Sequence, residues 1–240
     1  MSVLKRVLKG YQQRRGELLD VASRLFHERG YWATPVSAII KAAGVAKGTF
    51  YHYFDSKESL LDAIVLRMVD AIMAGAREAE RREGLNAVER LNVFFAAAGR
   101  WKAENAPLVI GLVRALYREE NVLLRHKITE RGAAIVAPAL TEIIRQGVEE
   151  GSFNAGEPED AAEILMQLFV GFREISAALL LGAEEHPGNW PLISRKLASC
   201  EQAVERVLGA PEGSVHLADE NAVRAFREAM EAGAGGEGKR

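Results

Sequence analysis

The stretch VSAIIKAAGVAKGTFYHYF, residues 36–54, carries the strongest structural signal in this chain of 240 residues. Val36 and Ile39 begin the apolar spacing of one helical face, so the sequence predicts a short helix with a buried side. Gly44 predicts the end of that helix, because glycine adopts a left-handed backbone at little cost. A second short helix is predicted from about residue 47 to residue 54. Two such helices form either an ordinary helical hairpin or a helix-turn-helix DNA reader.

The second of these helices carries polar side chains where a core helix would carry leucine. Phe50 and Phe54 lie four residues apart and anchor one side. The positions left to face outward are Lys47, Gly48, Thr49, Tyr51 and His52. Lysine, threonine and histidine can contact base edges in a major groove, and a tyrosine hydroxyl can reach a phosphate. This surface favours the DNA reader over the hairpin.

The flanking segments favour the same interpretation. Residues 16–29 are amphipathic and predict the third helix that a helix-turn-helix unit needs for its core. Thr34 and Pro35 are suited to begin the helix at Val36, threonine as a cap and proline as a first helical residue. Downstream, Ser56 can cap a further helix.

From about Arg14 to Leu61 the chain resembles the N-terminal domain of the TetR family of bacterial transcriptional regulators. The glycine turn, the Lys-Gly-Thr start of the second helix, its aromatic residues and the following Ser-Lys-Glu carry this resemblance, over about a fifth of the chain. Ala46 departs from the family, where a serine that caps the helix is usual. The resemblance implies contacts with bases or phosphates for Thr34, Lys47, Gly48, Thr49, Tyr51, His52, Tyr53 and Lys57. It also implies a homodimer on a near-palindromic operator of double-stranded DNA, and a C-terminal domain that binds an inducer.

Charge is distributed unevenly along the chain. The net charge is −2 overall, but residues 1–57 hold ten Lys or Arg against four Asp or Glu, which is +6 and leaves −8 for the rest. A basic N-terminal segment followed by an acidic remainder is typical of a DNA-binding domain joined to a regulatory domain. Lys5, Arg6, Lys9, Arg14 and Arg15 lie ahead of and at the start of the first predicted helix. They belong either to a basic arm that contacts DNA or to a solvated, partly disordered terminus.

The rest of the chain predicts helices nearly throughout, because no segment alternates like a strand. The predicted fold class is all-α, with an N-terminal three-helix helix-turn-helix DNA-binding domain followed by a larger helical ligand-binding and dimerisation domain. We expect four parts: the basic arm and helix-turn-helix domain in residues 1–56, a connecting helix in 57–82, the helical domain in 83–210, and a C-terminal extension in 211–240. In that extension a short helix is predicted over residues 219–230 and a disordered, glycine-rich tail from Gly233.

Other classes of function find little support in the sequence. The five histidines lie far apart, Cys200 is the single cysteine, and no phosphate-binding loop or nucleophile elbow is present. We therefore expect no catalytic activity, no metal and no cofactor. No apolar run is both long enough and free of charge to span a bilayer, and the N-terminus lacks the apolar core of a signal peptide. We expect no membrane partner and a cytoplasmic location.

Two C-terminal segments, residues 161–181 and 190–208, are apolar over more than one face. Such a helix is normally buried between neighbours. These segments pack either against their own domain or with their symmetry mates in a four-helix dimer interface, which the family resemblance also implies. A protein that recognises a two-fold symmetric DNA site needs two-fold symmetry itself, which favours the dimer.

An unidentified small-molecule inducer is expected in the C-terminal domain. Ligand sites are mostly apolar with a few polar groups, so polar or aromatic residues within apolar helices are the candidates. They are Trp101, Tyr117, His126, Gln167, Phe169 and Arg173. Each can instead be a core, solvated or paired residue. Arg173 is the most informative, because a charge within an apolar helix needs a carboxylate partner or an acidic ligand.

These patterns predict a dimeric, sequence-specific DNA-binding transcriptional regulator, namely a repressor that an inducer releases from its operator. One alternative is an activator of the same fold. Another is an architectural DNA-binding protein without sequence preference, against which the acidic body argues.

Overall fold

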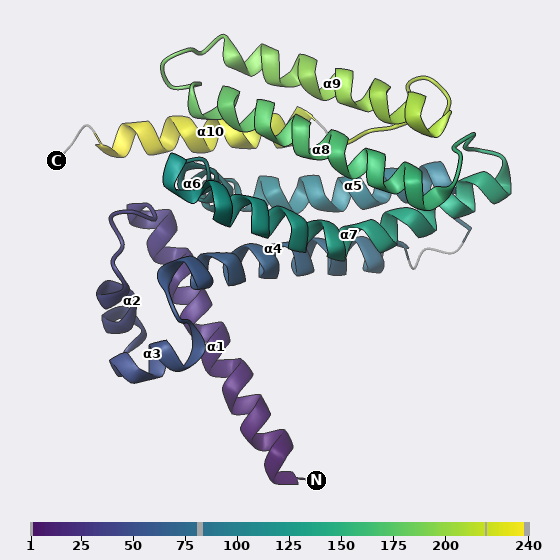
Figure 1. Cartoon of the computed structure of the whole chain (residues 1–240). Helices are drawn as coiled ribbons and strands as arrows, with labels where there is room; N and C mark the ends of the chain where they lie inside the picture. The colour runs from purple at the N-terminus through teal and green to yellow at the C-terminus, as the bar shows by residue number, and fades with distance from the viewer. Residues whose placement is uncertain (1, 81–83, 219, 238–240) are drawn as a thin grey trace. The chain divides into compact units, whose positions relative to one another are not determined.

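The computed structural model describes residues 2–80, 84–218 and 220–237 (Figure 1). All regular elements in these ranges are helices, and the predicted all-α class is confirmed. The helices are α1 (Ser2–Arg29), α2 (Val36–Ala43), α3 (Lys47–Tyr53), α4 (Lys57–Glu80), α5 (Ala87–Glu104), α6 (Ala106–Leu116), the 3-10 helix η1 (Glu119–Asn121), α7 (Val122–Glu150), α8 (Pro158–Leu181), α9 (Asn189–Leu208) and α10 (Glu220–Glu237).

The chain forms two compact units, each with its own core. The first unit comprises residues 1–68 and 108–128, and the second comprises residues 69–107 and 129–240. This division differs from the expected boundary at residue 56, because Leu112, Ala115 and Ile128 are buried in the core of the first unit. The helices α4, α6 and α7 each have residues in both units.

The core of the first unit joins α1, α2, α3 and the first half of α4. On α1, Leu18, Ala22 and Leu25 repeat at helical spacing and are buried. Ile39 of α2 and Phe50 of α3 are completely buried against this stripe. Burying each large apolar side chain stabilises the unit by about 1.5–3 kcal/mol, which fixes the positions of two otherwise short helices.

The second unit packs parts of α4 and α7 with α5, α8, α9 and α10 around a separate core. Leu140 and Ile144 of α7 and Leu165 of α8 are completely buried there. Figure 1 shows α8 and α9 side by side, and these two helices share an extensive contact. Gly147 allows the Phe153 ring to approach α7 closely, because a β-carbon at this position would lie 2.0 Å from the ring.

Helix boundaries differ from the predictions at both ends of the chain. The first helix begins at Ser2 and not near residue 16, so the segment that carries Lys5, Arg6 and Lys9 is helical and not an irregular arm. At the other end, α10 continues to Glu237, whereas a disordered tail was predicted from Gly233. The last two residues of the predicted connecting helix, 81 and 82, lie outside the described residues.

One helix in the described part of the chain, α8, is long and apolar enough to cross a membrane by length and composition alone. The expectation of no such segment rested on charge, and α8 does contain Arg173 and Glu174. Core helices can pass the same test of composition, but only 17% of the apolar window in α8 is buried. Ile164 and Ile175 are the large apolar side chains of α8 that remain exposed among the described residues.

Candidate nucleic-acid interface

The turn between α2 and α3 is built around Gly44. This residue adopts a left-handed conformation, with φ of 63°, and ends α2 as predicted. The N–H of Gly44 donates to the carbonyl of Lys41, and the N–H of Val45 donates to the carbonyl of Ile40. The side chain of Val45 packs against the core of the first unit. The turn therefore holds α2 and α3 as a fixed pair.

Helix α3 presents a polar face above an aromatic anchor. Phe50 and Phe54 are buried with their ring centroids 5.9 Å apart. The residues on the opposite face are exposed, namely Lys47, Gly48, Tyr51 and His52, with Thr49 half-buried beside them. The ammonium group of Lys47 lies 5.9 Å from the Tyr51 ring centroid. An exposed face with amine, hydroxyl and imidazole groups can bind base edges and phosphates in a major groove.

Tyr53 turns toward α1 and is half-buried. Its ring centroid lies 4.6 Å from that of Tyr11, and the Tyr11 ring lies 5.8 Å from that of His52. Tyr11 therefore packs on the C-terminal end of α3, a role that the sequence analysis missed. The sequence does contain a signal for this packing, since Tyr11 precedes Leu18 by two helical turns and continues the buried stripe of α1.

Lys57 is held against aromatic rings at the start of α4. Its ammonium group lies 4.0 Å from the Tyr31 ring centroid and 5.5 Å from that of Trp32. Burial lowers the pKa of Lys57, while the Glu58 carboxylate opposes this shift. The guanidinium of Arg118 lies 4.8 Å from the Trp32 ring, so a second cation shares this aromatic surface. Arg118 was not predicted to lie here, because it is remote from the helix-turn-helix in sequence.

The position of Thr34 differs from the expected contact with DNA. The side chain is completely buried, so it does not lie on the surface of the unit. Its hydroxyl donates to the carbonyls of Gly30, at 2.8 Å, and Leu25, at 3.3 Å. It does not cap α2, which begins after Pro35 without a side-chain cap. Thr34 therefore stabilises the C-terminal end of α1.

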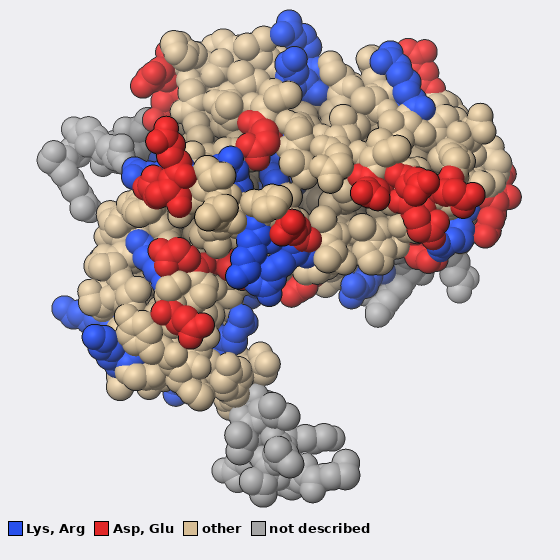
Figure 2. Space-filling model, viewed as in Figure 1, with Lys and Arg blue, Asp and Glu red and all other residues tan. Residues whose placement is uncertain are grey.

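The charges near α2 and α3 are suited to a polyanion. Figure 2 shows Lys and Arg side chains at the outer edge of the region that carries these helices. Arg14 is paired with Glu17 at 2.6 Å, whereas Lys41 and Lys47 form no ion pair with a carboxylate of the described residues. Unpaired lysines attract phosphates with a strength that falls as salt rises.

The predicted ligand residues do not form a single group in either unit. Tyr117 and His126 belong to the first unit, where the Arg125 guanidinium lies 4.5 Å from the Tyr117 ring. Trp101, Gln167, Phe169 and Arg173 belong to the second unit. Gln167 is exposed. Only Phe169 and Arg173 share a helical face, one turn apart on α8.

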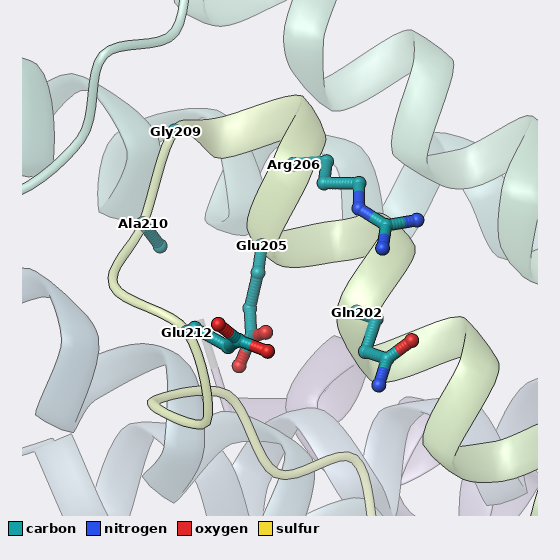
Figure 3. A pocket seen from close by; sticks show the side chains of 6 residues that line it. All are labelled: Gln202, Glu205, Arg206, Gly209, Ala210 and Glu212. Atoms are coloured by element: carbon teal, nitrogen blue, oxygen red, sulfur yellow. The ribbon is translucent and has the colours of Figure 1, made fainter.

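Two surface recesses lie elsewhere in the second unit. The first, of about 310 Å³, lies at the C-terminal end of α9 (Figure 3) and is lined by Gln202, Glu205, Arg206, Gly209, Ala210 and Glu212. Within it, the Glu205 carboxylate accepts a hydrogen bond from the N–H of Val215 at 3.0 Å, which gives it a structural role. The second, of about 450 Å³, is lined in part by Trp190 and Met230. None of the predicted ligand residues lines either recess. No three His, Cys, Asp or Glu side chains converge on a metal site among the residues that the structure describes.

Comparisons with known proteins agree with this geometry. The family model of bacterial regulatory proteins of the tetR family matches residues 18–64. The HTH-type transcriptional repressor KstR2 of Rhodococcus jostii is 33% identical over 153 residues, which make up 61% of this chain and 71% of that protein. The HTH-type transcriptional activator FasR of Mycolicibacterium smegmatis is 44% identical over 69 residues, 29% of this chain and 32% of that protein.

A solved structure of a TetR-family transcriptional regulator from Pectobacterium atrosepticum has the same fold, with a TM-score of 0.62 at 18% identity over 84% of this chain and 97% of that one. The family model covers the helix-turn-helix described above, and the similarity to KstR2 extends well beyond it. The chain therefore belongs to the TetR family and is a DNA-binding transcriptional regulator.

Proposed function

We propose that this regulator is a repressor which binds its operator as a homodimer and is released by a small molecule. The similarity to a protein named as a repressor extends over 61% of the chain, whereas the similarity to the activator FasR extends over only 29%. The longer match includes sequence outside the DNA-binding helices, which supports repression over activation. Such a role belongs in the cytoplasm, where the chromosome lies, and it is a binding role without catalysis.

In this proposal the exposed face of α3 enters the major groove. Lys47, Thr49, Tyr51 and His52 are the residues that contact DNA, with Gly48 allowing close approach of the backbone. Tyr53 packs against Tyr11 of α1 and so supports α3. Lys57 contacts a phosphate from its position beside the aromatic rings. The exposed, polar face of α3 on a buried aromatic anchor is the observation that carries DNA binding.

The second unit supplies the dimer interface through α8 and α9. Ile164 and Ile175 of α8 are 55% and 46% exposed, and only 17% of the apolar window of this helix is fully buried. Exposed apolar area costs about 25 cal/mol for each Å² left in water, so pairing with a second copy is favourable. A four-helix interface made from two copies of α8 and α9 covers these side chains.

Release by a ligand requires that the ligand distinguish a DNA-binding state from a second state. A full reversal of the two populations needs about 5.5 kcal/mol of differential binding energy. The helices α4, α6 and α7 each continue from one unit into the other. A conformational change that a ligand causes in the second unit can therefore be transmitted along these helices to the DNA-binding helices. No metal or cofactor has a part in this proposal.

Selection from a library of random DNA duplexes tests the proposed function. The full-length protein is expected to enrich an inverted repeat, with half-sites one helical turn apart, about 10–10.5 base pairs, or a multiple of that spacing. Sedimentation of the bound complex is expected to show an even number of protein copies. A bound pool without any enriched sequence would contradict operator recognition and favour the architectural alternative.

A further inference from the structure

Tyr31 and Trp32, which follow α1, form an aromatic surface on the first unit that holds two cationic side chains. The Lys57 ammonium, at the start of α4, lies 4.0 Å from the Tyr31 ring centroid and 5.5 Å from that of Trp32. The Arg118 guanidinium, just before η1, lies 4.8 Å from the Trp32 ring centroid. Trp32 is 43% exposed, and Arg118 is exposed as well. The aromatic surface therefore places an accessible cation from outside the helix-turn-helix beside Lys57.

Trp32 holds the two cations close to each other. Both are measured to the same ring, so the two charges are separated by no more than about 10 Å, the sum of 4.8 and 5.5 Å. Lys57 forms no ion pair with a carboxylate in the ranges that the structure describes. The neighbouring Glu58 carboxylate instead accepts a hydrogen bond from the Tyr31 hydroxyl at 3.4 Å. Like charges at this separation repel each other, and an anion that contacts both relieves the repulsion.

Glu120 is the carboxylate that pairs with Arg118, and this pair is weak. Nη1 of Arg118 lies 3.7 Å from Oε1 of Glu120, which is longer than a hydrogen bond. The two side chains are 54% and 53% exposed, and exposed ion pairs contribute little to stability because water and salt screen them. A guanidinium can bind a phosphate through two parallel hydrogen bonds. A phosphate that approaches from solvent can therefore replace Glu120 as the partner of Arg118.

The position of Lys57 indicates which partner brings phosphates to this surface. Lys57 is the first residue of α4 and follows Tyr53, the last residue of α3, by four positions. It therefore lies directly after the helix proposed to enter the major groove, and the positive end of the α4 dipole also favours a phosphate there. Phosphates of one DNA strand follow each other about every 3.4 Å along the helix axis. Two cations within about 10 Å of each other can thus contact one stretch of the DNA backbone.

We infer that Arg118 is a further contact between this regulator and the DNA backbone, and that Trp32 positions its guanidinium beside Lys57. The flat ring restricts the orientation of the guanidinium, so less side-chain freedom is lost when a phosphate binds. The inference rests on the proposed docking of α3 and adds a contact from the segment between α6 and α7. The family model matches residues 18–64, so that match carries no information about Arg118.

Arg118→Gln tests the contact by removing the charge from an exposed side chain. Fluorescence anisotropy of the full-length protein with the selected duplex, over a range of salt concentrations, is the measurement. Binding is expected to weaken at least about tenfold at low salt, the effect of one lost charge-assisted hydrogen bond or more. The slope of log K against log salt should fall by about 0.9 for each bound protomer, which is about 1.8 for a dimer.

Lys127→Gln is the matched control, because it removes an exposed positive charge from α7 in the same unit. It should leave the slope unchanged. The sequence selected from the random library should also be the same for wild type and Arg118→Gln, since a phosphate contact carries no direct information about the bases.

Variants of Trp32 test whether the ring positions the guanidinium. Trp32→Phe keeps a ring and should retain at least about half of the affinity. Trp32→Ala should lower both the affinity and the salt slope toward those of Arg118→Gln, whereas Arg118→Lys keeps the charge and should retain the slope. A wild-type slope in Trp32→Ala would overturn the positioning role.

A purely structural role for Arg118 predicts a different result. Arg118→Gln would then lower the free energy of unfolding but keep the wild-type salt slope, and that outcome would overturn the inference. An equal fall in slope for Lys127→Gln would overturn it too, because Arg118 would then act like any other surface charge.

A variant of α3 keeps this result separate from the proposed function. Wild-type binding by Arg118→Gln, together with loss of binding by the double variant Lys47→Ala and Tyr51→Ala, would overturn the Arg118 contact and leave the proposed function intact. Retained binding by the α3 variant would contradict the docking of α3 instead, and the salt slope would still decide the Arg118 contact.

Discussion

Helices α3 and α8 both expose a face that does not belong to the core, but the chemistry of the two faces is opposite. On α3 the buried anchor is aromatic and the exposed residues are polar or basic, such as Lys47 and His52. On α8 the exposed residues include Ile164 and Ile175, and only 17% of its apolar window is buried. A polar face can remain in water without cost, whereas an apolar face of this length is expected to have a partner.

This difference separates two kinds of recognition in one chain. The α3 face suits a charged and hydrated partner, which agrees with DNA binding. The α8 face suits a second protein surface.

Removing the aromatic anchor of α3 is expected to have the largest effect. Phe50→Ala deletes a completely buried ring and should destabilise the first unit by about 3–5 kcal/mol, with loss of DNA binding. Leu123→Ala is the control, because Leu123 belongs to the same unit and is 84% exposed, so it should change stability by less than about 0.5 kcal/mol. Denaturant unfolding measures both. Similar stability of the two variants would show that Phe50 does not anchor α3.

Placing charges on the exposed face of α8 is expected to break the dimer. The double variant Ile164→Glu and Ile175→Glu should weaken self-association at least about a hundredfold, because unpaired charges at an apolar contact cost more than about 3 kcal/mol. Helix content should be unchanged, since both side chains are already exposed. Analytical ultracentrifugation measures the association, with Leu123→Glu on the first unit as the control. A double variant that still forms dimers would place the interface elsewhere.

Lys102 on α5 gives a pH-dependent effect on the stability of the second unit, because burial lowers its pKa. The pKa of Lys102 in the folded protein lies below its ordinary value of 10.5. Below the folded-state pKa the amine is charged in both states, and the folded state bears the cost of desolvation. As pH rises from that pKa toward 10.5, the unfolded chain binds more protons, so this cost is progressively removed and stability increases.

Lys102→Met should therefore raise the melting temperature most at about pH 7, and its advantage over wild type should shrink toward about pH 10. Thermal denaturation at several pH values measures the difference. An advantage that does not change with pH would mean that the amine is not desolvated.

The smallest effect is expected at the N-terminus of α3. Ala46 occupies the cap position and makes no side-chain hydrogen bond to the first turn. Ala46→Ser supplies a hydroxyl that can accept from a free N–H and should stabilise the first unit by about 1 kcal/mol. Ala42→Ser, at an exposed position inside α2, is the control and should give no gain. Thermal denaturation can compare the two variants.

Local patterns were enough to predict α2, the turn at Gly44 and the anchor at Phe50. Each depends on spacing and on backbone preferences within a few residues. Periodicity also identified α8 as unusually apolar. It could not show which elements cover a face, because the spacing of apolar residues in one helix carries no information about the helix that packs on it. The burial of Leu112 and Ile128 in the core of the first unit was therefore not predicted.

Side-chain roles that depend on distant partners were harder to predict. Thr34 was expected on the DNA surface, but the end of α1 buries it completely. Lys57 contacts aromatic rings, and Arg118 shares one of them from a remote part of the sequence. Arg173 was recognised as a charge that needed a partner, but its hydrogen bond to Thr129 on α7 could not be predicted. Tertiary packing sets all four environments.

Binding of the selected duplex by the double variant Lys47→Ala and Tyr51→Ala tests the central claim most directly. Fluorescence anisotropy across a range of salt concentrations is the measurement, and the double variant Arg224→Ala and Arg227→Ala, which changes two exposed residues on α10, is the control. Loss of specific binding by the α3 variant is predicted, with an unchanged fold and a slope of log K against log salt lower by about 0.9 for each phosphate contact removed. Specific binding equal to that of wild type, with the same salt dependence, would contradict the assignment of α3 as the DNA-reading helix.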